Sequence, residues 1–305
     1  MNHVCVMEVG PRDGFQSIEP FIPTDIKIKL IKNLGNCGFS RMELGSFVSP
    51  ARLPQMADAR EILAAVGERL ANGGAVLVPN VKGAQFASAA GARGLVTVIS
   101  ATESHNQANI GRSIEGSMNE LGQILRTAPR DIFIRLNIAT SFHCPFEGPV
   151  SARSVAAIVG PAVEARPGIE IGLCDTIGKA MPTEVSALFG GCMREFPNCT
   201  WAFHGHDTYG FGVANVLAAY EAGVRVIDSA AGGLGGCPFA PGASGNVATE
   251  DVVYTFERLG ISTGIDFESL LSVADQMTKV PGAVMGGHIR DVMLRVPKIS
   301  TRAIQ

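Results

Sequence analysis

The chain has 305 residues, of which 46% are hydrophobic and 17% are charged, and its formal net charge at pH 7 is −3. This composition is typical of a globular chain and excludes an intrinsically disordered one. The slightly negative charge gives no basic footprint for nucleic acid or an anionic membrane, so we expect neither as a partner.

Short β-rich segments alternate with longer helical ones along nearly the whole chain. The predicted strands are rich in Val, Ile, Leu and Phe, as strands covered on both faces are: Val4–Val9, Phe39–Leu44, Ala75–Pro79, Leu95–Ser100, Ile132–Ala139, Ile169–Cys174, Thr200–His206 and Arg225–Ser229. Helical periodicity is found in Asp25–Cys37, Gln55–Leu70, Ile114–Thr127, Ser151–Ala165, Pro182–Glu195 and Ala214–Ala222, and in two terminal helices, Val247–Leu259 and Phe267–Met277.

Eight β segments alternating with helices predict a parallel-sheet α/β architecture. Their number favours a (β/α)8 TIM barrel with additional C-terminal helices, although a doubly wound open sheet has the same alternation. A G-x-G-x-x-G turn is absent after the first strand, which disfavours a dinucleotide-binding sheet. Because no linker divides the chain, we expect one catalytic domain over residues 1–305 with a C-terminal helical extension.

The seven cysteines lie at irregular spacings, which is typical of free thiols in a reducing compartment. No apolar run is long enough to span a bilayer, and no signal peptide precedes the first predicted strand. We therefore expect a cytoplasmic protein.

Polar residues gather where the predicted strands stop. In a TIM barrel these positions converge on the C-terminal mouth, where active sites lie. They are Arg12 and Asp13 after the first strand, Glu43 at the end of the second, Asp175 after the sixth, His204 and His206 in the seventh, and Cys237 and Asn246 in the Gly-rich loop after the eighth.

His204-Gly205-His206 is the sharpest local signal. Residues two apart in a strand point to the same side, so both imidazoles can reach one metal ion. Barrel closure would bring Asp13 and Asn246 beside them, and this mixture of nitrogen and oxygen ligands suits Mg²⁺ or Mn²⁺. The alternatives are two ordinary core or surface histidines, with Asp13 and Asn246 as turn residues.

The remaining polar residues each allow a catalytic and a structural interpretation. Arg12 could stabilise an enolate or form a surface salt bridge. Glu43 and Asp175 need a partner such as Arg12 or a metal-bound water, or Asp175 could fix barrel loops. Cys237 could deliver a proton from a mobile glycine loop or be an inert thiol. Cys144 and the adjacent His143 could line the pocket or stiffen its wall.

Taken together and in order, these motifs resemble those of the hydroxymethylglutaryl-CoA lyases, a family of metal-dependent TIM barrels. The stretches that carry the resemblance are Glu8–Gly14, Ser46–Pro50, Pro54–Met56, Cys144–Gly148, Asp175–Gly178, His204–Gly210 and Gly233–Asp251. The segment Phe15–Glu19 departs from the family's usual Leu-Gln-Asn-Glu, and the region around Phe142 is bulkier than usual. Both would border the substrate, which bears on the identity of the acyl group.

The resemblance implies that Asp13, His204, His206 and Asn246 bind the divalent metal. It implies that Arg12 acts at the reacting oxygens, that Cys237 is the mobile-loop thiol, and that Glu43 and Asp175 are supporting carboxylates.

The activity implied is retro-Claisen cleavage of 3-hydroxy-3-methylglutaryl-CoA, or a related acyl-CoA, to acetyl-CoA and acetoacetate, with His204 or a carboxylate as base. A homodimer and a part in leucine degradation are implied by the resemblance alone. The alternatives are a Claisen-condensing synthase or aldolase of the same superfamily, and a non-catalytic acyl-CoA-binding barrel.

Overall fold

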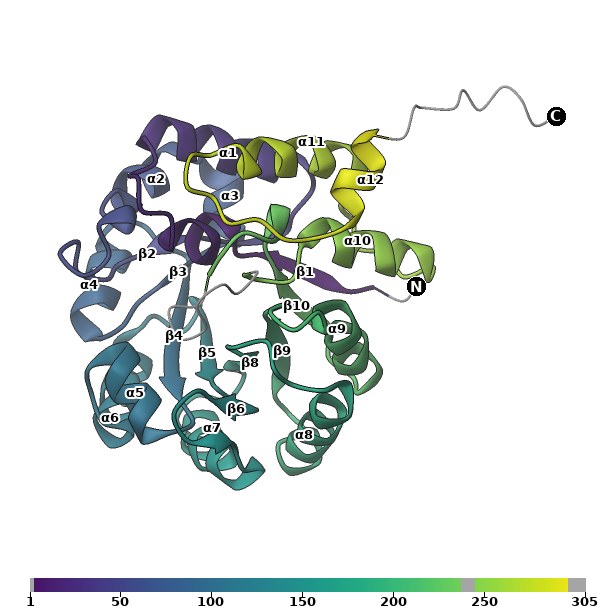
Figure 1. The fold of residues 1–305 in the computed structure, drawn as a ribbon. Helices are drawn as coiled ribbons and strands as arrows, with labels where there is room; N and C mark the ends of the chain where they lie inside the picture. The colour runs from purple at the N-terminus through teal and green to yellow at the C-terminus, as the bar shows by residue number, and fades with distance from the viewer. Residues whose placement is uncertain (1–2, 237–244, 296–305) are drawn as a thin grey trace.

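The computed structural model describes residues 3–236 and 245–295. Eight parallel strands close into a barrel in the order β1-β10-β9-β8-β5-β4-β3-β2, with helices around it (Figure 1), which confirms the predicted TIM barrel. The strands are β1 (Cys5–Glu8), β2 (Arg41–Ser46), β3 (Gly74–Leu77), β4 (Gly94–Ser100), β5 (Phe133–Ala139), β8 (Glu170–Asp175), β9 (Thr200–Gly205) and β10 (Val226–Ser229). A small antiparallel hairpin, β6 (His143–Cys144) and β7 (Gly148–Pro149), follows β5.

The helices follow the strands in the expected alternation. They are α1 (Thr24–Asn36), α2 (Ala59–Ala65), α3 (Glu68–Gly73), α4 (Val81–Ala89), α5 (Glu103–Ile110), α6 (Ile114–Thr127), α7 (Ala152–Ala165), α8 (Pro182–Glu195), α9 (Gly212–Glu221), α10 (Thr249–Arg258), α11 (Phe267–Thr278) and α12 (Ile289–Arg295). A π-helical turn at Gly10–Gly14 and 3₁₀ turns at Pro54–Met56 and Ala231–Gly233 complete the set. Within the described residues, no helix combines the length and apolar character needed to cross a bilayer.

The helix after the last barrel strand belongs to the barrel rather than to the extension. α10 follows β10 and packs against α9, and so completes the ring around the strands. The extension therefore consists of α11, which packs on α1 and α10, and α12, which packs on α10 and α11 (Figure 1).

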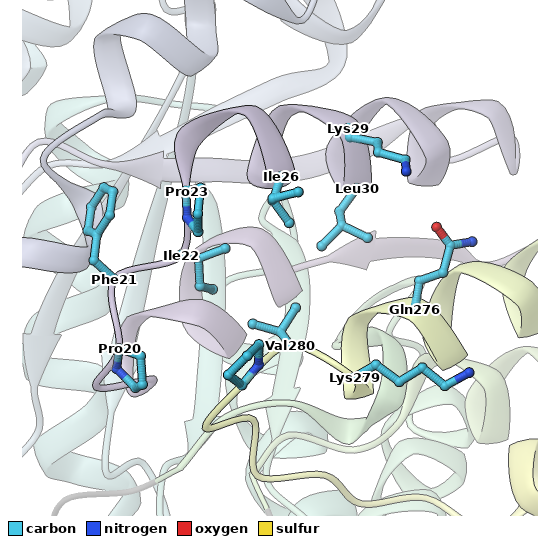
Figure 2. Close-up of a pocket in the computed structure, with 11 residues that line it drawn as sticks. Pro20, Phe21, Ile22, Pro23, Ile26, Lys29, Leu30, Gln276, Lys279 and Val280 are labelled. Carbon is cyan, nitrogen blue, oxygen red and sulfur yellow. The ribbon is translucent and has the colours of Figure 1, made fainter.

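A pocket of about 480 Å³ lies where α11 meets α1 and the segment that precedes α1. Its surface is mainly apolar, and Figure 2 shows Lys29, Gln276 and Lys279 together at one end. Its lining residues are Pro20, Phe21, Ile22, Pro23, Ile26, Lys29, Leu30, Gln276, Lys279, Val280 and Pro281.

Two predicted elements differ from the structure because of glycines with a positive φ angle. The predicted helix Gln55–Leu70 is broken into shorter pieces, and Gly67, at φ +79°, separates α2 from α3. Gly38, at φ +101°, turns the chain after α1, so the second strand starts at Arg41 and not at Phe39. Glu43 consequently lies inside β2 rather than at its end.

Candidate metal centre and active site

Three of the predicted metal ligands meet at the C-terminal mouth of the barrel. Asp13 lies in the π-helical turn after β1, His204 lies on β9, and His206 comes just after β9. One ligand atom of each lies within 4.8 Å of the others. Asp13 Oδ2 is 3.9 Å from His204 Nε2 and 3.6 Å from His206 Nε2, and all three residues are buried.

The local backbone explains how two histidines come to share one centre. The imidazole centroids of His204 and His206 are 5.3 Å apart. A Cβ atom on the intervening Gly205 would lie 2.7 Å from the ring of Phe203, so a side chain there would disturb the barrel packing. Gly205 also accepts a 3.0 Å hydrogen bond from the backbone N–H of Val247, which brings the chain after the Gly-rich loop beside the histidines.

Asn246 joins the same centre through its side chain. Its Nδ2 donates to Asp13 Oδ2 (2.8 Å) and to the carbonyl of Leu234 (3.0 Å). Its Oδ1 is buried and accepts no hydrogen bond from any described residue. A buried carbonyl oxygen without a donor, beside a carboxylate and two imidazoles, fits a divalent cation that prefers oxygen and nitrogen ligands.

Arg12 is fixed by carboxylates on two sides. Its Nε donates to Glu43 and its Nη1 donates to Asp13, and all three side chains are at least 92% buried. Burial alone would raise the pKa of the Asp13 carboxyl, but the neighbouring Arg12 and the two histidines hold that pKa well below its usual range. The contact between Arg12 Nε and Glu43 is the pairing that the sequence predicts.

Asp175 is buried at the end of β8 but makes different contacts. Its Oδ1 accepts from the backbone N–H of Lys179 and its Oδ2 from that of Ala180, both at 3.0 Å. Burial raises the pKa of Asp175, and these two backbone hydrogen bonds oppose the rise. This geometry favours the loop-fixing interpretation, because Arg12 pairs with Glu43 and Asp13 instead.

The structure describes Cys144 and His143, which follow the fifth strand, but not the predicted thiol Cys237. Cys237 lies outside the described residues. Cys144 is buried and accepts a 3.1 Å hydrogen bond from the hydroxyl of Thr102, which favours its structural interpretation. His143 Nε2 lies 3.1 Å from Glu184 on α8.

Two residues that the sequence does not single out contact the predicted ligands. Gln16 Nε2 donates to Asp13 Oδ1 at 2.6 Å, and Asp228 Oδ2 lies 3.3 Å from His204 Nδ1. Asp228 carried a signal, because a charged residue inside a short apolar strand needs a partner. Gln16 carried none beyond its place three residues after Asp13.

Comparisons with known proteins agree with one another. The HMGL-like family model matches residues 3–277. The chain is 40% identical over 278 residues to the cytoplasmic 3-hydroxy-3-methylglutaryl-CoA lyase of Rattus norvegicus, covering 91% of this chain and 81% of the relative. It is 42% identical over 273 residues to the mitochondrial hydroxymethylglutaryl-CoA lyase of Homo sapiens, covering 89% of this chain and 84% of the relative.

Solved structures show the same similarity in three dimensions. The Bacillus subtilis HMG-CoA lyase superposes with a TM-score of 0.91 at 36% identity and covers 96% of this chain and 99% of that one. An HMG-CoA lyase of Acinetobacter baumannii, solved in complex with coenzyme A and 3-methylmalate, superposes with a TM-score of 0.88 at 39% identity. It covers 95% of this chain and 94% of that one.

Proposed function

The chain belongs to the HMGL-like family, and on this basis we propose that it is a carbon–carbon lyase that cleaves 3-hydroxy-3-methylglutaryl-CoA to acetyl-CoA and acetoacetate. The reaction is a retro-Claisen cleavage of a tertiary alcohol. The observation that carries the proposal is the convergence of Asp13, His204 and His206 within 4.8 Å at the barrel mouth, beside a fixed Arg12.

We propose Asp13, His204, His206 and Asn246 as the ligands of a divalent cation, with Mg²⁺ and Mn²⁺ as the candidates. The unpartnered Oδ1 of Asn246 and the carboxylate–imidazole cluster support this set. A divalent cation bound there would polarise substrate oxygens and acidify a hydroxyl group. Gln16 and Arg12 would hold the Asp13 carboxylate in place from its other oxygen.

In this proposal Arg12 stabilises the negative charge that develops on the thioester as the carbon–carbon bond breaks. Its guanidinium needs no reorganisation, because Glu43 and Asp13 already fix two of its nitrogens. A positive charge aligned in advance in a buried site favours an enolate-like transition state.

The proton acceptor in the proposal is a carboxylate rather than His204. Each ring nitrogen of His204 already faces a carboxylate, Asp228 on one side and Asp13 on the other. As a ligand, His204 would bind the cation through one nitrogen and carry a proton on the other, so it would have no nitrogen left to take up a proton. Glu43 Oε1 is buried and accepts no hydrogen bond from the described residues, so its lone pairs are available.

Cys237 is the proposed proton donor to the acetyl-CoA enolate. The support is its place in the sequence directly after Gly235-Gly236. We expect Cys237→Ser to lose most turnover and to keep wild-type metal content. Loss of metal in that variant would contradict the role.

The test of the whole proposal is incubation with 3-hydroxy-3-methylglutaryl-CoA and Mg²⁺ or Mn²⁺, with acetoacetate as the measured product. Acetoacetate should appear with the cation and disappear with a chelator. His206→Ala should bind the cation weakly and give little product. No product from metal-loaded wild-type protein would refute the proposal, and a panel of 3-hydroxy-3-alkyl acyl-CoA substrates would define the acyl group.

We further propose a single-domain subunit, a homodimer and a cytoplasmic location. The dimer rests on the family resemblance alone. Sedimentation equilibrium of the purified chain tests the dimer, and fractionation of the source cells tests the location.

A further inference from the structure

His204 faces a carboxylate with each of its ring nitrogens. Nε2 lies 3.9 Å from Asp13 Oδ2 in the proposed metal site, and Nδ1 lies 3.3 Å from Asp228 Oδ2. Asp228 is 1% exposed and sits on β10, in register with His204 on β9. It therefore contacts the histidine from within the barrel and not from the mouth.

Asp228 is held in place from across the barrel. Arg135 on β5 donates from Nη1 to both Asp228 oxygens, at 2.6 and 2.8 Å. Its Nε bonds Glu170 at 2.5 Å, and Glu170 is bonded in turn by Arg41 at 2.8 and 3.0 Å. Carboxylates and guanidinium groups thus alternate along Asp228, Arg135, Glu170 and Arg41. Each carboxylate has a guanidinium partner of opposite charge.

The chemistry of a carboxylate decides which nitrogen of His204 carries the proton. Nδ1 is buried and has no described hydrogen-bond partner, so Asp228 at 3.3 Å is the group placed to accept its proton, because an ionised carboxylate only accepts hydrogen bonds. When a cation takes the place of the proton at Nε2, on the side of Asp13, the imidazole keeps its remaining proton on Nδ1, beside Asp228. A second carboxylate that fixes the tautomer of a metal-binding histidine is a recurring arrangement in metalloproteins.

We propose that Asp228 is a positioning residue that sets the ring orientation and tautomer of His204, so that Nε2 is the ligand atom. Asp228 acts through His204 and does not itself touch substrate. The inference rests on the proposed function only in taking His204 as a metal ligand.

Glu170 provides a matched control for this role. It is a buried carboxylate bonded to the same Arg135, yet its partners in the chain are Arg135 and Arg41 and not His204. If Asp228 served only to stabilise the barrel, Asp228→Asn and Glu170→Gln would have similar effects. If it positions His204, only Asp228→Asn should weaken metal binding strongly.

The experiment measures Mn²⁺ affinity from the electron paramagnetic resonance of free Mn²⁺, together with thermal unfolding, in wild type and both variants. We expect both variants to lose stability. Asp228→Asn should weaken Mn²⁺ binding about 10- to 100-fold, whereas Glu170→Gln should stay within about threefold of wild type. Equal Mn²⁺ affinities in folded Asp228→Asn and wild type would overturn the inference.

A measurement on the unaltered protein decides the matter should Asp228→Asn fail to fold. Imidazole nitrogen NMR of wild type loaded with diamagnetic Mg²⁺ should show His204 with its proton on Nδ1 and none on Nε2, and a proton on Nε2 of the loaded protein would overturn the inference. Neither measurement uses a CoA thioester, so absence of lyase activity would refute the proposed function and leave these results standing.

Discussion

At the residue scale, the paired Arg12 and Glu43 combine a fixed positive charge with a carboxylate oxygen that no described residue occupies. Glu43→Gln removes the charge and keeps the shape. We expect kcat to fall by about 100-fold or more, because the proposed proton acceptor is lost. Mn²⁺ affinity should change little, because Glu43 is not among the proposed ligands.

Steady-state kinetics with 3-hydroxy-3-methylglutaryl-CoA tests this expectation. Glu195→Gln, at the exposed end of α8, is the control and should keep wild-type kcat. An unchanged kcat in Glu43→Gln would remove Glu43 from the mechanism.

Glu8 makes the stability depend on pH. Its fully buried carboxylate accepts hydrogen bonds from Gly10 N (2.7 Å), Ala231 N (3.0 Å) and Thr249 Oγ1 (2.8 Å). Burial outweighs these bonds and raises the pKa of Glu8 from 4.5 to about 7. Between these values the folded protein binds the proton more tightly than the unfolded chain, so the free energy of unfolding falls as pH rises.

We therefore expect Glu8→Gln to reduce the decline in unfolding free energy between pH 4.5 and about 7, with an upper limit of about 3 kcal/mol for this group. Urea unfolding at several pH values measures the slope of the unfolding free energy against pH. Glu250→Gln should reduce it too, because burial raises the pKa of Glu250 to about 7 as well. A wild-type slope in Glu8→Gln would contradict the assignment.

Residue identity predicted which side chains meet at the candidate metal site but not the residues that support them. Alternation in a strand placed His204 and His206 on one side, and barrel closure added Asp13 and Asn246, four residues that the structure brings together. The contact of Asp228 with His204 depends on the register between the neighbouring strands β9 and β10, which residue types do not fix.

At the element scale, hydrogen bonds and an ion pair connect α12 and the segment before it to Glu250 and Gly232, on either side of the Gly-rich loop. Arg290 Nη1 lies 3.3 Å from Glu250 Oε1 on α10, and Glu250 Oε2 accepts from the backbone N–H of Gly232 at 2.9 Å. Gly286 N also donates to the carbonyl of Gly232 at 2.9 Å. The segment before α12 thus rests on the chain that leads into Gly235-Gly236.

Arg290→Met should lower the free energy of unfolding by about 1–3 kcal/mol, because it leaves a buried carboxylate without its cation. Chemical denaturation followed by the fluorescence of Trp201, the single tryptophan, measures this change. Lys279→Met breaks an exposed ion pair with Asp275 and should shift the value by less than about 1 kcal/mol. Equal losses of unfolding free energy in the two variants would contradict a stabilising ion pair between Arg290 and Glu250.

Elements were predictable where apolar periodicity was long, and less so where a single glycine decided the outcome. The order of the eight barrel strands followed from alternation, whereas α4, α5 and the β6–β7 hairpin were not among the predicted elements. The break between α2 and α3 at Gly67 and the late start of β2 after Gly38 depend on backbone angles, which composition does not fix.

At the scale of the whole molecule, the proposed ligands join distant parts of the barrel. Asp13 follows β1, the histidines belong to the β9 segment, and β10 lies between these two strands. A cation bound there should stabilise the folded barrel over the unfolded chain. At 100 times its dissociation constant the gain is about 2.7 kcal/mol.

We expect Mn²⁺ or Mg²⁺ to raise Tm by roughly 5 °C and excess chelator to reverse the rise. Differential scanning calorimetry measures the shift. His206→Ala should show little response to the cation, and a full wild-type response in that variant would exclude His206 as a ligand.

The distance between Asp13 and Asn246 along the chain also sets when the site can exist. During synthesis the ribosome releases Asp13 among the first residues, while Asn246 follows 233 positions later. Partial chains that end before β9 lack both imidazoles as well. A nascent polypeptide therefore cannot assemble the proposed metal centre until most of the barrel has been translated.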